Sequence, residues 1–486
     1  MKPFYITTTL PYVNSDPHIG FALELIRADI IARKKKIEGY DVFFNTGTDE
    51  HGIKIYRKAK DQHIDTKDYV DQYADKFKNL IPLLGIMPEI NFIRTTDKHH
   101  ISAAQEFWKI ADKNGLIYKK NYSIKYCIGC ELEKTDSELV ENKCPLHPLQ
   151  DLELIEEENY FFRFSIYQKQ LLKLYEDENF VIPKTRLNEI RAFVERGLED
   201  FSISRLQSKM PWGIPVPGDE SQVMYVWFDA LVNYISAIGW PEDMDSFNKW
   251  HVQSGGMVQY CGKDNLRQQS AMWQAMLMAV KLPPSKQIII DGFVTGEGGI
   301  KMSKSLGNTI DPLDVVKNYG TEALRYYVCR EVSPFDDSPF TMEKFKDAYN
   351  AHLANGLGNL VSRVMKMAEA NSIKYNQNVE KKLEETEELL AFYKKYNEGF
   401  AEYNLEKAST VIWDIVSGSD KIIQERQPFK KIKTDKEGAV ADIEELLARL
   451  HIIGKLLMPI LPQTAETIVD LVLQNKMPET PLFIRK

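Results

Sequence analysis

Cysteine is scarce in this chain, which has five cysteines among 486 residues. So few cysteines in a chain of this length exclude a disulfide-stapled secreted fold. No apolar run reaches the roughly 18 residues that a membrane helix needs, and the first residues lack the uninterrupted apolar core of a secretory signal. These absences predict a soluble, cytoplasmic protein that makes no membrane contact.

The chain also lacks an excess of positive charge, because its formal net charge is -8. This balance excludes wholesale non-specific binding of nucleic acid, although a local basic face is compatible with it. The sequence contains neither a Walker A pattern nor a Gly-x-Gly-x-x-Gly after a strand, which disfavours P-loop and dinucleotide-binding proteins. The length is sufficient for two or three domains.

The first residues follow a strand–loop–helix order. Residues 4–9 are rich in β-branched and aromatic side chains and are predicted to form a buried strand. A turn over 11–17 follows, and apolar residues then recur at helical spacing from Ile19 to Ile30. A strand over 42–44, a loop over 45–52 and a helix repeat this order. Such repetition predicts a Rossmann-like parallel α/β sheet, whose ligands bind at the carboxyl ends of the strands.

The α/β pattern is interrupted once and then gives way to helices. We expect a first α/β half over 1–114, an inserted domain over 115–225, a second α/β half over 226–341 and an α-helical bundle over 342–486. Strands are predicted at 224–227, 257–260 and 288–290. Long amphipathic segments at 353–367, 383–393, 405–416 and 443–457 predict the bundle.

Three of the five cysteines lie close together in the predicted insert. Cys127 and Cys130 form a C-x-x-C, and Cys144 and His147 form a C-x-x-H shortly afterwards. Two such pairs suit one tetrahedral zinc site, which would be structural because four protein ligands leave no open position. Free thiols on loops are the alternative. A redox C-x-x-C is disfavoured because it leaves the second pair unexplained.

Two further motifs suit chemistry on a nucleoside triphosphate. One is His18-Ile19-Gly20-Phe21, where a strand passes into a helix, and the other is Lys301-Met302-Ser303-Lys304-Ser305, preceded by three glycines. A histidine at a helix start can donate to a phosphate, and the two lysines can neutralise the β and γ phosphates. The glycines suit a closing lid. The alternative for the second motif is a solvated basic loop.

Together, in this order, the two motifs resemble the signatures of class I aminoacyl-tRNA synthetases. Across nearly the whole chain the sequence resembles the methionyl-tRNA synthetases, on the matching pieces 9–14, 47–52, 203–205, 212–217, 226–231, 262–264 and 301–308. The resemblance implies a catalytic domain split by a zinc-knuckle insert and followed by an anticodon-binding bundle. It implies that ATP, with Mg2+, activates L-methionine to methionyl-adenylate, which then charges tRNA(Met). A monomer is expected.

The resemblance also implies roles for individual residues. The nucleotide site comprises His18, Gly20, Gly262, Asp264, Lys301, Ser303 and Lys304, of which His18, Lys301 and Lys304 are catalytic. The amino-acid site comprises Leu10, Tyr12, Asp49, Trp227, Ala230, Tyr234 and Gln269, with Asp49 holding the ammonium group. Simple core packing is the alternative for the apolar members of this set. Asn359, Arg363 and Phe429 are implied in anticodon contact, beside a basic strip of Lys421, Arg426, Lys430, Lys431 and Lys433.

Several positions depart from the family pattern. Phe21 stands where a second histidine is usual, which predicts slower activation. Gln268 and Gln269 stand where an aromatic or proline and then a histidine are usual, and Gln274 replaces a proline. Asp420 stands where the family often has an asparagine, and Phe429 stands where it usually has a tryptophan.

Three hypotheses follow from these departures. The first is a divergent but ordinary enzyme. The second is a paralogue with a different acceptor, or one that activates a more polar amino acid because Gln269 brings an amide to the pocket wall. The third, a non-catalytic RNA-binding derivative, is disfavoured because Lys301 and Lys304 are intact while the anticodon residues are altered.

Overall fold

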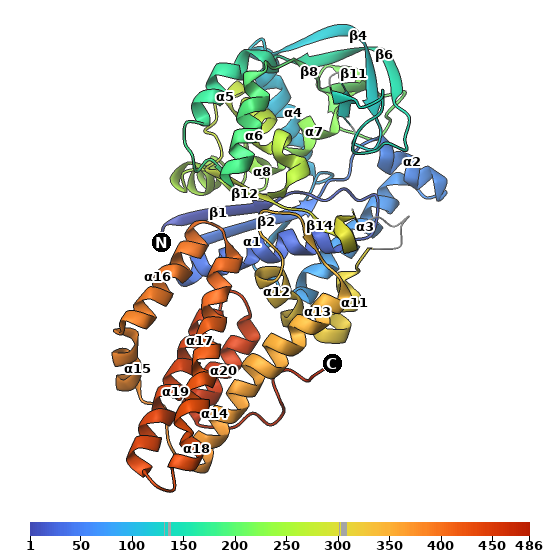
Figure 1. Ribbon diagram of the computed structural model, residues 1–486. Helices are drawn as coiled ribbons and strands as arrows, with labels where there is room; N and C mark the ends of the chain where they lie inside the picture. Colours follow the sequence, from blue (N-terminus) through green and yellow to red (C-terminus); the bar gives the residue numbers. More distant parts are fainter. Residues whose placement is uncertain (131, 135–137, 301, 303–308) are drawn as a thin grey trace.

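The centre of the protein is a six-stranded sheet, seen edge-on across the middle of Figure 1. The computed structural model describes residues 1–130, 132–134, 138–300, 302 and 309–486. All strands of this sheet run parallel. Their order is β3 (Asn91–Arg94), β2 (Asp41–Thr48), β1 (Pro3–Thr8), β12 (Val258–Gly262), β13 (Gln287–Asp291) and β7 (Val181–Ile182).

The strand order reverses between β1 and β12. From β1 the chain proceeds outward to β2 and β3 on one side, whereas from β12 it proceeds to β13 on the other. Ile6 of β1 pairs with Val258 of β12 and with Phe44 of β2. These residues are at most 1% exposed, as expected for strands covered on both faces. The predicted parallel α/β sheet is confirmed, and its ligand crevice is expected where the order reverses.

Helices connect and cover the strands. The first half of the chain contributes α1 (Ile19–Ile37), α2 (Ile53–Asp61), α3 (Thr66–Leu83) and α4 (Lys98–Lys113). The segment after the insert contributes α7 (Val226–Ala230), α8 (Asn233–Ser236), α9 (Met244–Phe247), η3 (Asn248–Gln253), η4 (Lys263–Asn265), η5 (Gln268–Met272) and α10 (Trp273–Ala279). Most of α1 is buried, because it packs between the sheet and the helices that follow it.

The segment predicted as an insert forms the top of the molecule in Figure 1. It holds one antiparallel sheet of β4 (Ile117–Cys127), β5 (Leu132–Lys134), β6 (Glu153–Phe162) and β8 (Phe201–Ser202), and a second of β9 (Ser204–Leu206), β10 (Pro215–Val216) and β11 (Asp219–Met224). Beside them lie η2 (Phe164–Tyr167), α5 (Gln168–Leu174) and α6 (Lys184–Glu195). Strand β7 comes from this same segment, yet it joins the central sheet.

One predicted strand is wrong. Residues 224–227 were expected to be extended, but β11 ends at Met224 and α7 begins at Val226. Val226 and Phe228 are buried. A short apolar run of this kind suits a buried helix turn as well as a strand, and periodicity alone does not separate the two.

The C-terminal part is helical and extends below the sheet in Figure 1. Three short elements come before the helix α13. They are the strands β14 (Val294–Thr295) and β15 (Ser338–Pro339), which pair in parallel, and the turn η6 (Glu297–Gly299). The helices are α11 (Pro312–Tyr319), α12 (Thr321–Arg330), α13 (Met342–Ala348), η8 (Tyr349–Gly358), α14 (Asn359–Ala370), α15 (Gln377–Glu384), α16 (Glu387–Ala401), α17 (Leu405–Arg426), α18 (Pro428–Lys431), α19 (Lys436–Leu457) and α20 (Pro462–Gln474). The predicted helical bundle is confirmed.

Helix α12 joins the sheet region to this bundle. Arg325 is fully buried and forms an ion pair of 2.8 Å with Asp29 of α1. The same guanidinium donates to the carbonyls of Pro459 and Ile460, between α19 and α20. Among the helices that the structure describes, none is long and apolar enough to cross a membrane.

Candidate active site

A cavity of about 460 Å³ opens at the carboxyl ends of the central strands, where the strand order reverses. Its walls come from the segments that follow β1, β2, β12 and β13, and from α1, α7 and α8. The predicted site residues among its lining are Leu10, Tyr12, His18, Gly20, Asp49, Trp227, Ala230, Tyr234, Gly262, Asp264 and Gln269. The fold therefore brings together residues that lie far apart in the sequence.

His18 is the N-cap of α1, as its position after the first strand predicts. Its Nδ1 accepts a hydrogen bond of 3.1 Å from the backbone N–H of Gly20. Because Nδ1 accepts, the proton of the neutral imidazole lies on Nε2, which is then a donor. His18 is exposed at the cavity, at the positive end of the helix dipole. This geometry suits binding of an anionic group.

Asp49 is 5% exposed and follows directly after β2. Its backbone is fixed to the segment after β1, since Asp49 N–H donates to Pro11 and Val13 N–H donates to Asp49. The hydroxyl of Tyr12 donates to the carbonyl of His51, which ties the same two loops a second time. A carboxylate and an aromatic ring thus share one rigid corner of the cavity.

A buried carboxylate fixes this corner to the opposite wall. Asp229 of α7 accepts from His51 Nδ1 at 2.7 Å and from His100 Nε2 of α4 at 2.9 Å. Burial opposes its charge, but the two imidazoles hold the pKa of Asp229 below its ordinary value. Asp229 lies between Trp227 and Ala230 along α7, so the two cavity residues of this helix are anchored to the loop that carries Asp49.

The deep part of the cavity is apolar and aromatic. Trp227 and Tyr234 line it from α7 and α8, and the Tyr234 ring packs against Trp273 with ring centroids 5.8 Å apart. Tyr5 of β1 donates to the carbonyl of Tyr234 at 2.8 Å. An apolar slot with a carboxylate at one corner suits an amino acid with a flexible hydrophobic side chain.

Three further carboxyl groups belong to the wall of the same cavity. Asp264, Glu24 and Asp291 all line it. Glu24 accepts two hydrogen bonds of 2.6 Å from Thr9, through the backbone N–H and the hydroxyl. Burial raises the pKa of Glu24 to about 8, and the Thr9 hydrogen bonds only partly oppose it. Burial likewise raises the pKa of Asp291 to about 6, against the pull of the Arg27 guanidinium at 3.2 Å.

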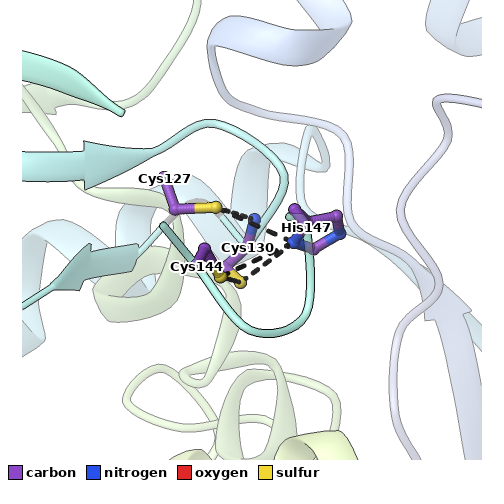
Figure 2. A group of neighbouring side chains, drawn as sticks. All are labelled: Cys127, Cys130, Cys144 and His147. Carbon is purple, nitrogen blue, oxygen red and sulfur yellow. Dashed lines mark hydrogen bonds between the residues drawn. The ribbon is translucent and has the colours of Figure 1, made fainter. Parts of the chain in front are cut away.

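The four predicted metal ligands meet in one cluster. Figure 2 shows the side chains of Cys127, Cys130, Cys144 and His147 directed toward one another. Their ligand atoms all lie within 4.8 Å of each other. His147 Nδ1 lies 3.2 Å from the sulfur of Cys130, and the sulfurs of Cys130 and Cys144 are 3.4 Å apart.

These separations fit a tetrahedral zinc site. Zinc–sulfur bonds of about 2.3 Å and a zinc–nitrogen bond of about 2.0 Å place the ligand atoms about 3.5 to 3.8 Å apart. Gly129 lies between the first two cysteines, where a Cβ atom would be 2.4 Å from the His147 ring. Its carbonyl accepts from Lys54 at 2.7 Å, and both Lys54 and His147 line the cavity. The cluster therefore forms part of the cavity wall.

Comparisons with known proteins agree with this site. A family model for tRNA synthetases class I (M) matches residues 4–153 and 148–365. A second model, the anticodon binding domain of methionyl tRNA ligase, matches residues 373–480. The chain is 39% identical to a methionine–tRNA ligase of Thermosynechococcus vestitus over 96% of this chain and 90% of that relative. The chain belongs to the methionyl-tRNA synthetase family.

Other members of the methionyl-tRNA synthetase family are similarly close. A methionine–tRNA ligase of Thermotoga maritima is 39% identical over 96% of this chain and 74% of that relative. A solved structure of Mycobacterium tuberculosis methionyl-tRNA synthetase in complex with methionyl-adenylate superposes with a TM-score of 0.90 and 31% identity, and each chain is covered completely. The resemblance stated from the sequence is confirmed.

Two departures from the methionyl-tRNA synthetase pattern have structural explanations. Phe21 is buried and packs edge-on against Phe77, with ring centroids 5.1 Å apart. Gln269 was expected to bring an amide to the pocket wall, and it does line the cavity. Its Oε1 accepts from Gln259 at 2.6 Å and its Nε2 donates to Tyr234 at 2.7 Å, so the protein itself satisfies both ends of the amide.

The predicted anticodon residues lie on α14 and α18 of the C-terminal helical bundle. Asn359 is exposed at the start of α14, and Arg363, one turn later, forms an ion pair of 2.8 Å with Asp420 of α17. Phe429 on α18 is 48% exposed. The basic strip is largely neutralised, because Arg426 pairs with Asp442 and Glu445, Lys431 with Asp435 and Asp442, and Lys421 with Glu425.

Three predicted nucleotide-site residues are not among those that the structure describes. Two carboxyl groups that line the cavity were not predicted. Lys301, Ser303 and Lys304 lie outside the described residues. Glu24 and Asp291 line the cavity but were not predicted. Glu24 had a signal in the sequence, because it stands one helical turn after Gly20 and so shares its face of α1. Asp291 also had one, because it directly follows the predicted strand at 288–290, and parallel α/β sheets bind ligands at the carboxyl ends of their strands.

Proposed function

We propose that this chain uses the cavity to activate methionine with ATP and then transfers the methionyl group to the 3′ end of tRNA(Met). The chain is a methionine–tRNA ligase of class I, and the proposal assigns its residues to the steps. The observation that carries the proposal is the convergence of His18, Asp49, Trp227 and Asp264, from four different segments, on one cavity at the strand-order reversal.

The amino acid occupies the aromatic end of the cavity. Asp49 binds its ammonium group, because a buried carboxylate in a fixed loop is a strong and directional acceptor for a charged donor. Tyr12 and Trp227 enclose the side chain, together with Leu10, Ala230, Tyr234 and Gln269. A thioether is soft and flexible, so it fills an apolar slot with its sulfur near ring edges.

ATP occupies the part of the cavity that His18 and Asp264 line. His18 donates from Nε2 to the phosphates, while Gly20 lets the backbone of α1 approach them. Gly262 and Asp264 bind the ribose. Lys301, Ser303 and Lys304 complete the phosphate site, and Mg2+ adds positive charge when it is bound. The carboxylate of methionine then lies in line with the α-phosphate, where its attack releases pyrophosphate.

The tRNA binds along the whole molecule. Asn359, Arg363 and Phe429 contact the anticodon loop, where an amide and a guanidinium suit base edges and an exposed ring suits stacking. The domain boundaries proposed from the sequence, at 114, 225 and 341, stay part of this proposal, as do a monomeric state and a cytoplasmic location.

Cys127, Cys130, Cys144 and His147 hold a structural zinc ion. The donor set and its separations support this assignment. Purified protein should contain about one zinc per chain by elemental analysis. Gly129→Ala should lower the zinc content, since a methyl group would collide with the His147 ring, whereas Ser123→Ala, at an exposed position of the preceding strand β4, should not. Equal zinc content in both variants would reject this arrangement.

A more polar amino acid is the second candidate substrate. The departure at Gln269 motivated it, but the amide of Gln269 is already hydrogen-bonded at both ends. A substrate side chain therefore has no unpaired amide to satisfy, which favours methionine.

ATP–pyrophosphate exchange with a panel of amino acids tests the proposal. Exchange should be fastest with methionine, and the same protein should then charge tRNA(Met). Exchange with a polar amino acid in preference to methionine would support the paralogue. Absence of exchange with every amino acid, with tRNA still bound, would support the non-catalytic derivative.

A further inference from the structure

Gln269 and Gln274, two departures from the family pattern, belong to one buried hydrogen-bond network. The network also includes Gln259 of β12, Ser285 before β13 and Tyr234 of α8. All five side chains are at most 4% exposed. Of the five, Tyr234 and Gln269 line the cavity, and the other three lie behind it.

One end of the network is fixed by backbone groups. The Oε1 of Gln274 accepts from the backbone N–H of Ser285 at 3.0 Å, and its Nε2 donates to the carbonyl of Gln269 at 2.8 Å. A backbone N–H can only donate and a carbonyl can only accept. The amide of Gln274 therefore has a single orientation.

The later hydrogen bonds follow in one direction from Gln274. Its Nε2 also donates to the hydroxyl oxygen of Ser285 at 3.0 Å, and the Ser285 hydroxyl donates its own hydrogen to Gln259 Oε1, at 2.6 Å. This arrangement gives the buried Ser285 hydrogen an acceptor. Gln259 must then use its Nε2 toward Gln269 Oε1, also at 2.6 Å. This leaves Gln269 Nε2 to donate to the Tyr234 hydroxyl, at 2.7 Å.

The chain of hydrogen bonds thus ends on an oxygen that accepts. Tyr234 still has its own hydroxyl hydrogen, and no acceptor for it is found among residues 1–130, 132–134, 138–300, 302 and 309–486. Burial raises the pKa of Tyr234 well above its ordinary value, so the hydrogen is retained at neutral pH. Because Tyr234 lines the cavity, the hydrogen is available to a bound ligand.

We propose that Gln274, Ser285 and Gln259 are positioning residues for amino-acid specificity. They orient the Gln269 amide so that the Tyr234 hydroxyl acts as a donor toward the substrate side chain. A donor at this depth favours a side chain with an acceptor atom, such as a thioether sulfur, over a hydrocarbon of the same shape. This inference rests on the proposed function, and it assigns part of the selectivity for sulfur to three residues that lie behind the cavity wall.

Methionine and norleucine separate this role from general stability, because norleucine has a methylene in place of the sulfur. The quantity measured is the ratio of kcat/KM for methionine to that for norleucine in ATP–pyrophosphate exchange. Gln274→Leu and Ser285→Ala should each lower this ratio by about 3- to 10-fold, the worth of one neutral hydrogen bond. Ser285→Ala removes a single oxygen and is therefore the milder change. It tests the same hydrogen-bond network if Gln274→Leu does not fold.

A double-variant comparison shows whether the effect acts through Tyr234. Tyr234→Phe should lower the ratio by a similar factor. Adding Ser285→Ala to Tyr234→Phe should then change the ratio no further, because the hydroxyl that the network orients is already absent. Gln222→Leu is the matched control. Gln222 is a buried glutamine in β11 with two hydrogen bonds of its own, outside the cavity, and this variant should keep the native ratio.

Two results would overturn the inference. One is a native ratio in both Gln274→Leu and Ser285→Ala, with both substrates affected equally. The other is a further fall of the ratio when Ser285→Ala is added to Tyr234→Phe. In either case native protein that exchanges well with methionine leaves the proposed function intact. Native protein without methionine exchange would overturn the proposed function, and this inference with it.

Discussion

The protonation of one side chain, Glu24, changes the charge of the proposed nucleotide site. It lies in the cavity with Asp264 and Asp291, where three negative charges would repel a triphosphate. Burial raises the pKa of Glu24 to about 8, above its ordinary 4.5, so the carboxyl group is neutral at pH 7. The neutral form lowers the negative charge of the cavity, which is compatible with the proposed binding of ATP there.

ATP affinity should therefore fall as pH rises through about 8. Below this pH Glu24 is protonated, and above it the ionised group adds a negative charge beside the phosphates. We expect KM for ATP to rise about 3- to 10-fold between pH 7 and pH 9, for a screened charge at this range. Glu24→Gln should flatten the profile, and Glu38→Gln, at the other end of α1, should not. A rise of the same size in Glu24→Gln would contradict the assignment.

Helix α12 is the element that connects the cavity to the anticodon bundle. Its Arg325 binds Asp29 of α1, the helix that begins at His18. Its Glu322 accepts from the backbone N–H groups of Gln463 and Thr464, at 2.6 and 2.8 Å, and so caps the start of α20. One helix thus holds both halves of the molecule through buried, charge-assisted hydrogen bonds.

Weakening this cap should separate the two half-reactions. Glu322→Gln removes a carboxylate from the positive end of α20 and should cost about 1 to 2 kcal/mol of stability. ATP–pyrophosphate exchange should stay near the native rate, because the cavity is untouched, while tRNA charging should slow several-fold. Thermal unfolding, exchange and charging measured on one preparation check this. Glu466→Gln, exposed on α20, is the control, and an equal loss of both activities would show that α12 acts only as a structural support.

The sequence predicted the existence of the central strands more reliably than it predicted short segments. The strands at 4–9, 42–44, 257–260 and 288–290 all exist, because buried parallel strands are rich in β-branched residues. The segment at 224–227 failed because it is too short for its periodicity to distinguish a strand from a helix turn. The addition of β7 to the central sheet was not predictable, since two residues carry no pattern.

The two proposed tRNA contacts lie far apart, because α18 is at the lower end of the helical bundle in Figure 1, whereas the cavity belongs to the central sheet in the middle of the molecule. Phe429 on α18 is the exposed aromatic ring of that far end, with Lys430 Nζ 5.8 Å from its centroid. Arg363 is held by Asp420 nearby. A ring that is 48% exposed gains by stacking against an unpaired base.

Phe429→Ala should raise KM for tRNA(Met) about 10-fold and leave ATP–pyrophosphate exchange unchanged, because base stacking is worth about 1 to 3 kcal/mol. Phe429→Trp should lower KM, since a larger ring stacks over more area. Leu390→Ala removes another exposed apolar side chain of the bundle and should have no effect. The assignment would be wrong if KM for tRNA were the same in native protein and Phe429→Ala.

The sequence by itself determined the family, the parallel sheet and the motif residues that line the cavity, because motif chemistry and strand periodicity are local properties. The cluster of Cys127, Cys130, Cys144 and His147 was also predictable, because two short ligand pairs at this spacing are typical of a zinc site. Only the tertiary structure decided what Gln269 and Gln274 do. Their hydrogen-bond partners come from strands and loops distant in the chain, and the direction of a hydrogen bond depends on which donors and acceptors the fold brings into contact.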